Sequence, residues 1–166
     1  MRVPIRKPGI STPLPNDPHL TPAKFQELQA KLIRLKSINR PREAEEVKRL
    51  ALMGDFSENA GYQLAKGRLR GLNQRILDLE NLLARAEIIE PSNDRETVQL
   101  GNFVTLKSGE QEITYQILGS VETNPGAGII SHNSPLGSAL LHCRIGETII
   151  VELRGRTKEY KILKIF

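Results

Sequence analysis

The sequence of 166 residues lacks tryptophan, has a single cysteine and contains few aromatic residues of any kind. One cysteine, Cys143, excludes an internal disulfide and any zinc site built from several cysteines, and it is typical of a protein in a reducing compartment. No apolar run is long enough to cross a membrane, and the proline-rich stretch after Met1 has no apolar core of the kind found in secretion signals. We therefore expect a cytoplasmic protein without a membrane partner.

The excess of positive charge is small. Lysine and arginine total 24 against 19 aspartate and glutamate residues, so the net charge is +5. A basic chain favours an acidic partner such as nucleic acid. Because firm binding of a duplex needs many phosphate contacts, this excess fits a protein that touches RNA or DNA briefly.

A change of composition near Pro91 predicts two domains. The chain before it has few β-branched clusters, whereas the chain after it is rich in Val, Ile and Thr and is punctuated by glycine. Residues 1–20 hold many prolines and few apolar groups, so we expect a flexible arm there. The polar residues 91–99 are typical of a linker, and they lead to a second domain over residues 100–166.

Residues 21–90 carry the periodicity of two long helices. Thr21 is a suitable N-cap and is followed by Pro22, at a first helical position that needs no N–H. Apolar residues then recur at alternating steps of three and four, and a seven-residue repeat from Tyr62 to Ala86 marks the second helix. Pro41 interrupts the first pattern and is expected to kink or reset that helix. Since the connection is short, the two helices are predicted to form an antiparallel coiled-coil hairpin.

The second domain is predicted to be a small antiparallel β-sheet with one short helix. Ser134 and Pro135 form a cap and first-turn pair before a helix that continues to Leu141, and Ser108-Gly109 and Arg154-Gly155 are typical turns. The predicted strands cover residues 103–106, 111–118, 127–131, 147–153 and 159–166. Together with the hairpin, this arrangement defines an α+β protein.

Two acidic residues, Asp55 and Glu58, lie in the segment 54–59 that connects the predicted helices. If this turn is helical, both carboxylates lie on one face, with Cβ atoms about 5–6 Å apart. The spacing also matches a capping box, which satisfies free N–H groups at a helix start and needs no ligand. Alternatively, carboxylates at the end of a rod can complete a Mg²⁺ site in a partner, because Mg²⁺ accepts one or two protein carboxylates together with water and phosphate.

No further motif in the sequence indicates chemistry. There is no internal repeat, no low-complexity tract and no glycine-rich phosphate loop. His132, His142 and Cys143 have no ordered spacing and are predicted to be packing residues rather than metal ligands. The chain is therefore not expected to hold a cofactor of its own.

The stretch GDFSENAGYQLAKGRLR resembles the tip segment of the bacterial Gre factors (GreA/GreB), whose pattern is Gly-Asp, two variable residues, then Glu-Asn-Ala-x-Tyr. Arg40-Pro41 lies where the family carries its Arg-Pro, and Ile88-Ile89 closes the hairpin in the same way. The stretch from Ile130 to Leu140, with Asn133-Ser134-Pro135, resembles the signature of the Gre C-terminal domain. The resemblance covers residues 21–166.

This resemblance implies an FKBP-like C-terminal domain that binds at the rim of the RNA polymerase secondary channel, while the hairpin enters the channel. Asp55 and Glu58 match the acidic pair that helps to hold the second catalytic Mg²⁺ and to orient the attacking water. By this resemblance the polymerase itself cuts the extruded RNA 3′ end of a backtracked complex, so the factor is an activator and not an enzyme. It is expected to act as a monomer.

The resemblance also implies contacts with RNA and with the polymerase. Lys66, Arg68 and Arg70 match basic positions of GreB-like members, which the family uses toward the RNA 3′ segment. Charged residues beside a coiled-coil seam are also common as solvated side chains, so both interpretations stand. Asn133-Ser134-Pro135 matches the loop that such factors apply to a polymerase coiled coil, although Ser134 also has the position of a helix cap.

Gly61 occupies a position that is commonly acidic in the family, and Phe56 adds an apolar group at the tip, so weaker cleavage than in typical members is expected. One alternative is a Gre-like factor that binds the same channel but inhibits or modulates the polymerase, although Asp55 and Glu58 argue for cleavage. A peptidyl-prolyl isomerase is another, because the implied domain is FKBP-like, but the second domain has few aromatic residues for a concave pocket. In a plain coiled-coil adaptor the tip would be only a turn.

Overall fold

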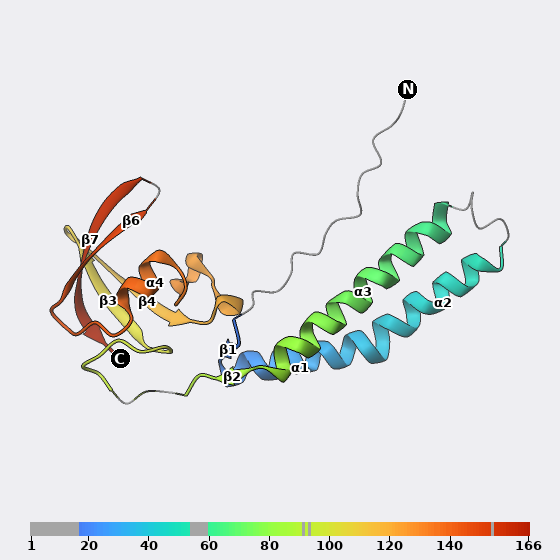
Figure 1. Ribbon diagram of the computed structural model, residues 1–166, viewed down its shortest axis with the longest axis horizontal. Helices are drawn as coiled ribbons and strands as arrows, with labels where there is room; N and C mark the ends of the chain where they lie inside the picture. Colours follow the sequence, from blue (N-terminus) through green and yellow to red (C-terminus); the bar gives the residue numbers. More distant parts are fainter. Residues whose placement is uncertain (1–16, 54–59, 91, 93, 154) are drawn as a thin grey trace, which may run out of the picture. The chain divides into compact units, whose positions relative to one another are not determined.

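The computed structural model describes residues 17–53, 60–90, 92, 94–153 and 155–166 (Figure 1). These residues form two compact units. The first unit is Gln26–Arg85, and the second unit combines the described part of Pro15–Phe25 with Ala86–Phe166. Within the described ranges, no helix combines the length and the apolar character needed to span a membrane.

A nearly continuous helical path forms the first arm of the hairpin. It consists of α1 (Pro22–Arg34), the π-helical segment η1 (Leu35–Asn39) and α2 (Arg40–Ala51). The predicted cap at Thr21 is confirmed, because its Oγ1 accepts a hydrogen bond from the Lys24 N–H at 3.2 Å. The helix therefore begins where the sequence indicates.

The predicted reset at Pro41 is confirmed as the π-helical segment η1. Proline has no N–H to donate, and its ring clashes with the carbonyl group of residue 37 in a regular α-helix. The wider π-helical turn relieves this conflict. In it the Arg40 N–H donates to the carbonyl oxygen of Leu35, five residues earlier, and not to that of the residue four positions earlier as in an α-helix. The helix thus passes the proline without ending.

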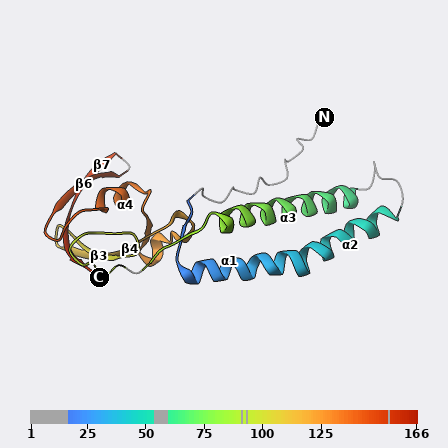
Figure 2. The same ribbon diagram turned by 60° about the horizontal axis from the view of Figure 1, so that its bottom comes forward.

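The second arm is α3 (Ala60–Ala84), which lies antiparallel to α2 (Figures 1 and 2). It buries Ala65, Ile76 and Leu79, which belong to the predicted seven-residue repeat. At the end of the helix Leu82 is 1% exposed, whereas the predicted seam residue Leu83 is only half-buried. The antiparallel hairpin is therefore confirmed, but α3 ends before the last predicted seam residue, Ala86, which belongs to the second unit.

The second unit is built on a five-stranded sheet with the order β5-β4-β3-β7-β6. Its strands are β3 (Phe103–Ser108), β4 (Gln111–Leu118), β5 (Ile129–Ser131), β6 (Thr148–Leu153) and β7 (Arg156–Ile165). The expectation of a wholly antiparallel sheet is wrong for one pair, because β4 and β5 run parallel. The connection between β4 and β5 contains two short 3₁₀ turns, η2 (Ser120–Glu122) and η3 (Pro125–Ala127). It brings the chain back along β4 before β5 begins, so β5 pairs in parallel, whereas a direct hairpin would make the pair antiparallel.

One hydrophobic core lies between this sheet and α4 (Pro135–Leu140). The helix contributes Leu136 and Leu140, and the strands contribute buried residues such as Val104, Ile117 and Ile162. Cys143 packs at the edge of this core, which confirms its predicted role as a packing residue. Burial raises the pKa of its thiol, and so does the nearby Glu147.

Two predicted borders of the second unit are wrong. The sequence places residues 17–20 in the arm, but β1 (His19–Leu20) pairs in parallel with β2 (Glu87–Ile88), and Leu20 is fully buried. The linker 91–99 includes Val98, which is also fully buried and joins the core. In both places burial of an apolar side chain stabilises the folded chain, because it removes apolar surface from water. The polar residues around that side chain hide this contribution from a reading of the local pattern. Residues 1–16 lie outside the described residues.

Candidate functional site

The predicted acidic tip, residues 54–59 with Asp55 and Glu58, lies outside the described residues. The structure describes the two helices on either side of it: α2 ends at Ala51, and α3 is described from Ala60 onward. The acidic pair therefore belongs to the connection between two antiparallel helices. Its proposed catalytic and metal-binding role stays a prediction.

Two of the predicted RNA-binding residues, Lys66 and Arg70, lie one helical turn apart on α3, and both are exposed. The Lys66 Nζ lies 6.0 Å from the centre of the Tyr62 ring. Lys66 and Arg70 line the same surface hollow of about 360 Å³. Within the described residues, neither side chain forms an ion pair with an acidic group, so both positive charges face solvent.

The third basic residue, Arg68, lies on the α2 side of α3. Its Nε donates to the Glu43 Oε2 at 3.1 Å, which links the two helices of the hairpin. Arg68 and Arg75 line a hollow that is separate from the one beside Lys66. A phosphate group that binds Arg68 would have to compete with the Glu43 carboxylate.

The predicted polymerase-binding loop, Asn133-Ser134-Pro135, connects β5 with α4. Asn133 and Pro135 are exposed. The Ser134 hydroxyl accepts a hydrogen bond from the Gly137 N–H at 3.0 Å and donates to the Ser131 carbonyl oxygen at 2.6 Å. Ser134 is therefore a helix cap, as its position in the sequence indicates, and its hydroxyl is occupied within the loop.

We expect Ser134→Ala to lower the free energy of unfolding of the second unit by about 1 kcal/mol, because it removes this cap. Ser134→Asp keeps an oxygen that can accept from the Gly137 N–H, and it should retain most of the stability. Urea unfolding of both variants measures the effect, with Ser138→Ala as the control. The Ser138 hydroxyl donates only to the Pro135 carbonyl oxygen, at 3.3 Å. Equal midpoints for the Ser134→Ala and Ser138→Ala variants would contradict the capping role.

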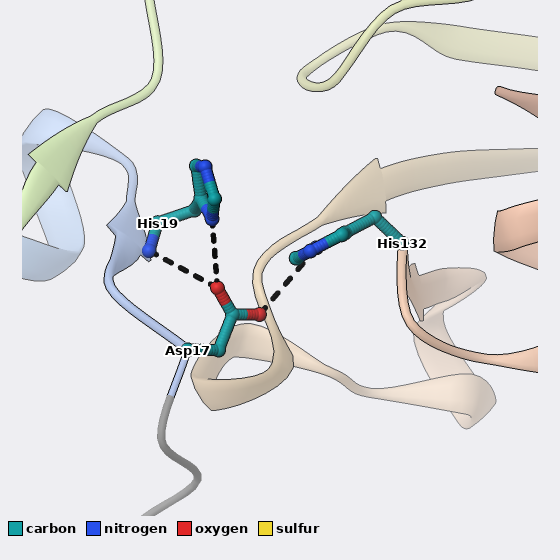
Figure 3. A group of neighbouring side chains, drawn as sticks. All are labelled: Asp17, His19 and His132. Carbon is teal, nitrogen blue, oxygen red and sulfur yellow. Dashed lines mark hydrogen bonds and ion pairs between the residues drawn. The ribbon is translucent and has the colours of Figure 1, made fainter. Parts of the chain in front are cut away.

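Beside this loop lies a cluster that the sequence did not indicate, formed by Asp17, His19 and His132 (Figure 3). The Asp17 carboxylate lies between the two imidazole rings. Its Oδ1 is 2.8 Å from the His19 Nδ1, and its Oδ2 is 3.4 Å from the His132 Nδ1. The rings themselves contact edge to face, with centres 5.1 Å apart.

Asp17 is also held by backbone groups. Its Oδ2 accepts from the Ser120 N–H at 2.6 Å, and its Oδ1 accepts from the His19 N–H at 3.1 Å. Burial by itself would raise the pKa of Asp17, but the hydrogen bonds from Ser120 and His19 outweigh it and lower the pKa from 3.8 to about 2. The carboxylate is therefore ionised at neutral pH.

This cluster was not predictable from local pattern. Asp17 and His19 fall within the predicted arm, and His132 was predicted to be a packing residue. Asp17 and Asn133, whose side chains lie 3.5 Å apart, are separated by 116 positions in the chain. Hydrogen bonds of Asp17 with the Ser120 N–H and of the Thr21 N–H with Glu122 hold the first segment beside the η2 turn, which lies next to β5.

Comparisons with known proteins identify the family. The model described as "Transcription elongation factor, N-terminal" matches residues 19–88, and the model described as "Transcription elongation factor, GreA/GreB, C-term" matches residues 92–166. The two matches cover almost the whole described chain. The protein belongs to the GreA/GreB family of transcription elongation factors.

Individual relatives agree with this assignment. The chain is 37% identical over 150 residues to transcription elongation factor GreA of a Nitratiruptor species, a match that covers 89% of this chain and 91% of the relative. It is 38% identical over 149 residues to the GreA of Pelobacter propionicus, a match that covers 88% of this chain and 94% of the relative. These names do not support the GreB-like subtype inferred from Lys66, Arg68 and Arg70.

Among solved structures, GreA factor homolog 1 of Thermus thermophilus is 26% identical to this chain. The match covers 89% of this chain and 97% of that chain, with a TM-score of 0.41. The assignment to the family is based on the sequence matches.

Proposed function

We propose that this protein stimulates the intrinsic RNA cleavage of bacterial RNA polymerase, acting in the cytoplasm as a monomer. In this proposal the hairpin enters the secondary channel, and the polymerase cuts the extruded 3′ end of a backtracked RNA. The observation that carries the proposal is the position of Asp55 and Glu58, in the connection between two antiparallel helices of a GreA/GreB family member. A pair of exposed helices encloses no substrate, so chemistry at this position needs the pocket of a partner.

Asp55 and Glu58 are the residues of this chain that would share a Mg²⁺ ion with the polymerase. Carboxylate oxygens are ligands that Mg²⁺ accepts, and two carboxylates leave room for water and phosphate oxygens in its coordination sphere. When bound there, Mg²⁺ lowers the pKa of a water molecule and stabilises charge on the phosphate. The two side chains would hold and orient the reacting groups, while the phosphodiester bond is broken in the polymerase active site.

We further propose that Lys66, Arg68 and Arg70 approach the phosphates of the extruded RNA. Lys66 and Arg70 are exposed and bind no acidic group within the described residues, so they can release counterions when they meet phosphate. Arg68 would first have to leave Glu43. Its contribution should therefore be the smallest of the three.

Replacing Lys66 and Arg70 with glutamine should weaken engagement of backtracked RNA and make it less sensitive to salt. For single-stranded nucleic acid, each lost phosphate contact lowers the slope of log K against log salt concentration by about 0.7, so the double variant should lose about 1.4. Concentration-dependent cleavage measured across a salt series gives this slope. The matched Arg68→Gln variant should change this slope less. An unchanged slope in the double variant would show that Lys66 and Arg70 are solvated side chains that do not contact the RNA.

In the second unit, the exposed residues Asn133 and Pro135 are proposed to contact the polymerase at the channel rim. Ser134 supports this loop through its two hydrogen bonds and does not need to touch the partner itself. In this proposal one unit anchors the factor and the other carries the acidic pair. The division matches the two family models, one for each region.

Adding the purified protein to a halted, backtracked elongation complex tests the proposed function. Shortened RNA with a new, extendable 3′ end is the expected result, at a rate above the intrinsic cleavage of the polymerase. Binding without shortened RNA would overturn the proposal and would favour the inhibitory or modulating alternative, for which Gly61 in place of an acidic residue is the supporting feature.

A further inference from the structure

All three histidines of the chain lie around one hollow in the second unit. His19, His132 and His142 line a space of about 370 Å³ together with Gln99 and nearby leucines. Two of these histidines also contact the buried carboxylate of Asp17 (Figure 3). Imidazole and carboxylate groups that converge in this way are the donors that proteins use for zinc and similar ions.

His19 lies between two carboxylates, one at each ring nitrogen. Its Nδ1 is 2.8 Å from the Asp17 Oδ1, and its Nε2 is 3.4 Å from the Glu87 Oε2. A neutral imidazole has a single N–H, so it can donate to only one of the two. With a cation between Nδ1 and Asp17, the ring donates its Nε2–H to Glu87, which is the usual arrangement of a metal-bound histidine with an outer carboxylate.

The distances suit a metal ion after small side-chain rotations. One donor atom each from Asp17, His19 and His132 can be chosen so that all three lie within 4.8 Å of one another. Zinc bonds of about 2.0–2.1 Å place neighbouring donors roughly 3.3–3.5 Å apart in a tetrahedral site. The His132 Nδ1 is already 3.4 Å from Asp17, and it is equally far from the Leu118 carbonyl oxygen, a contact that metal binding would replace.

We propose that Asp17, His19 and His132 bind a divalent transition-metal ion of the zinc class, with Glu87 orienting His19. Two imidazoles and one carboxylate favour Zn²⁺ over Mg²⁺ or Ca²⁺, which prefer oxygen donors alone. The fourth coordination position would be open to water from the adjoining hollow. This site is separate from the Mg²⁺ shared at the acidic tip, and it does not depend on the proposed cleavage function.

Such an ion would fasten two distant segments of the second unit. Asp17 and His19 precede α1, whereas His132 belongs to the loop that continues into Asn133. A ligand that binds only the folded arrangement stabilises it. The metal would therefore hold residues 17–20 against the loop proposed for polymerase contact.

Isothermal titration calorimetry of the full chain, without a polyhistidine tag and after removal of metals with a chelator, tests the site. We expect one Zn²⁺ per chain, no heat from Mg²⁺ or Ca²⁺ at the same concentrations, and a higher unfolding midpoint with Zn²⁺. His19→Asn and His132→Asn should abolish this binding, since asparagine keeps a polar group near the Nδ1 position but removes the imidazole. Glu87→Gln should weaken it about 10-fold or more, because it removes the outer carboxylate.

His142→Asn is the matched control. His142 lines the same hollow but is not one of the three clustered donors, and its φ of +67° is a conformation that asparagine tolerates well. This variant should bind Zn²⁺ like the unaltered chain. Absence of binding, binding that survives both His19→Asn and His132→Asn, or equal loss in His142→Asn would overturn the proposal. If a histidine variant fails to fold by circular dichroism, Glu87→Gln, on an exposed side chain, tests the site through the expected loss of affinity, and unchanged affinity would overturn the proposal.

Discussion

Asp55→Asn should abolish the stimulation of RNA cleavage in a backtracked complex, with a loss of about 100-fold or more in rate. Asparagine lacks the negative charge that a shared Mg²⁺ ion requires, and even loss of a group that only supports a metal ligand typically costs about 10–100-fold. It is nevertheless as good an N-cap as aspartate, so folding should be nearly unchanged. Single-turnover cleavage of a labelled RNA measures the loss, and Glu58→Gln should behave in the same way.

The control for this prediction is polymerase binding by the same variants. Both should compete with the unaltered protein for the polymerase, because the proposed contacts of the second unit, such as Asn133, are not altered. A variant that binds but does not stimulate cleavage separates the acidic pair from the rest of the protein. Undiminished cleavage with Asp55→Asn would contradict the metal-binding role. It would favour the interpretation that Asp55 and Glu58 form a capping box.

Gly119→Ala should release residues 17–20 from the second unit. Gly119 has φ −67° and ψ 158°, an extended conformation that any residue can adopt. The backbone conformation therefore does not require glycine at this position. A Cβ atom at this position would overlap the His19 carbonyl oxygen, where the two backbones pass closest. Because neither backbone can move without breaking the β1–β2 pairing or the Ser120 bond to Asp17, we expect a loss of about 2–3 kcal/mol.

Amide hydrogen exchange gives the clearest measurement of this change. The Glu87 N–H donates to the Pro18 carbonyl oxygen and the Ile89 N–H to that of Leu20, both at 2.8 Å, and these amides should lose protection in Gly119→Ala. Gly126→Ala is the matched control in the same unit, since its added Cβ would meet the nearest atom at an ordinary 3.6 Å. Protection of Glu87 and Ile89 equal to that of the unaltered chain would show that the close approach is not required.

The helices and strands were largely predictable because their signals are local. A cap and the N–H that it satisfies lie three residues apart, as at Thr21 and Ser134, so the sequence shows both partners together. The seven-residue repeat of α3 needs no knowledge of its partner to indicate a buried stripe. The effect of Pro41 was likewise predictable, since a missing N–H acts on its own helix.

The errors concern segments whose structure depends on distant residues. Leu20 is a single apolar residue in polar surroundings, and Val98 and Leu100 are too short an apolar pattern to indicate that a core will cover them. The parallel pairing of β5 depends on how the ten residues after Leu118 return to the sheet, which several turn sequences allow. Local pattern determines whether a strand forms, but it does not determine its direction in the sheet.

The acidic pair and the histidine cluster illustrate the same contrast. Asp55 and Glu58 stand three positions apart in a helix connection, so sequence alone identifies them as candidates, and their proposed role comes from the resemblance to the family. Asp17, His19 and His132 become neighbours only in the folded second unit, where Asp17 binds the Ser120 N–H and His132. Short-range hydrogen bonding and periodicity thus determined the helices and strands, and sequence motifs identified the family of this protein. The assembly of its second polar site was decided by tertiary packing, because contacts across more than a hundred residues leave no local pattern.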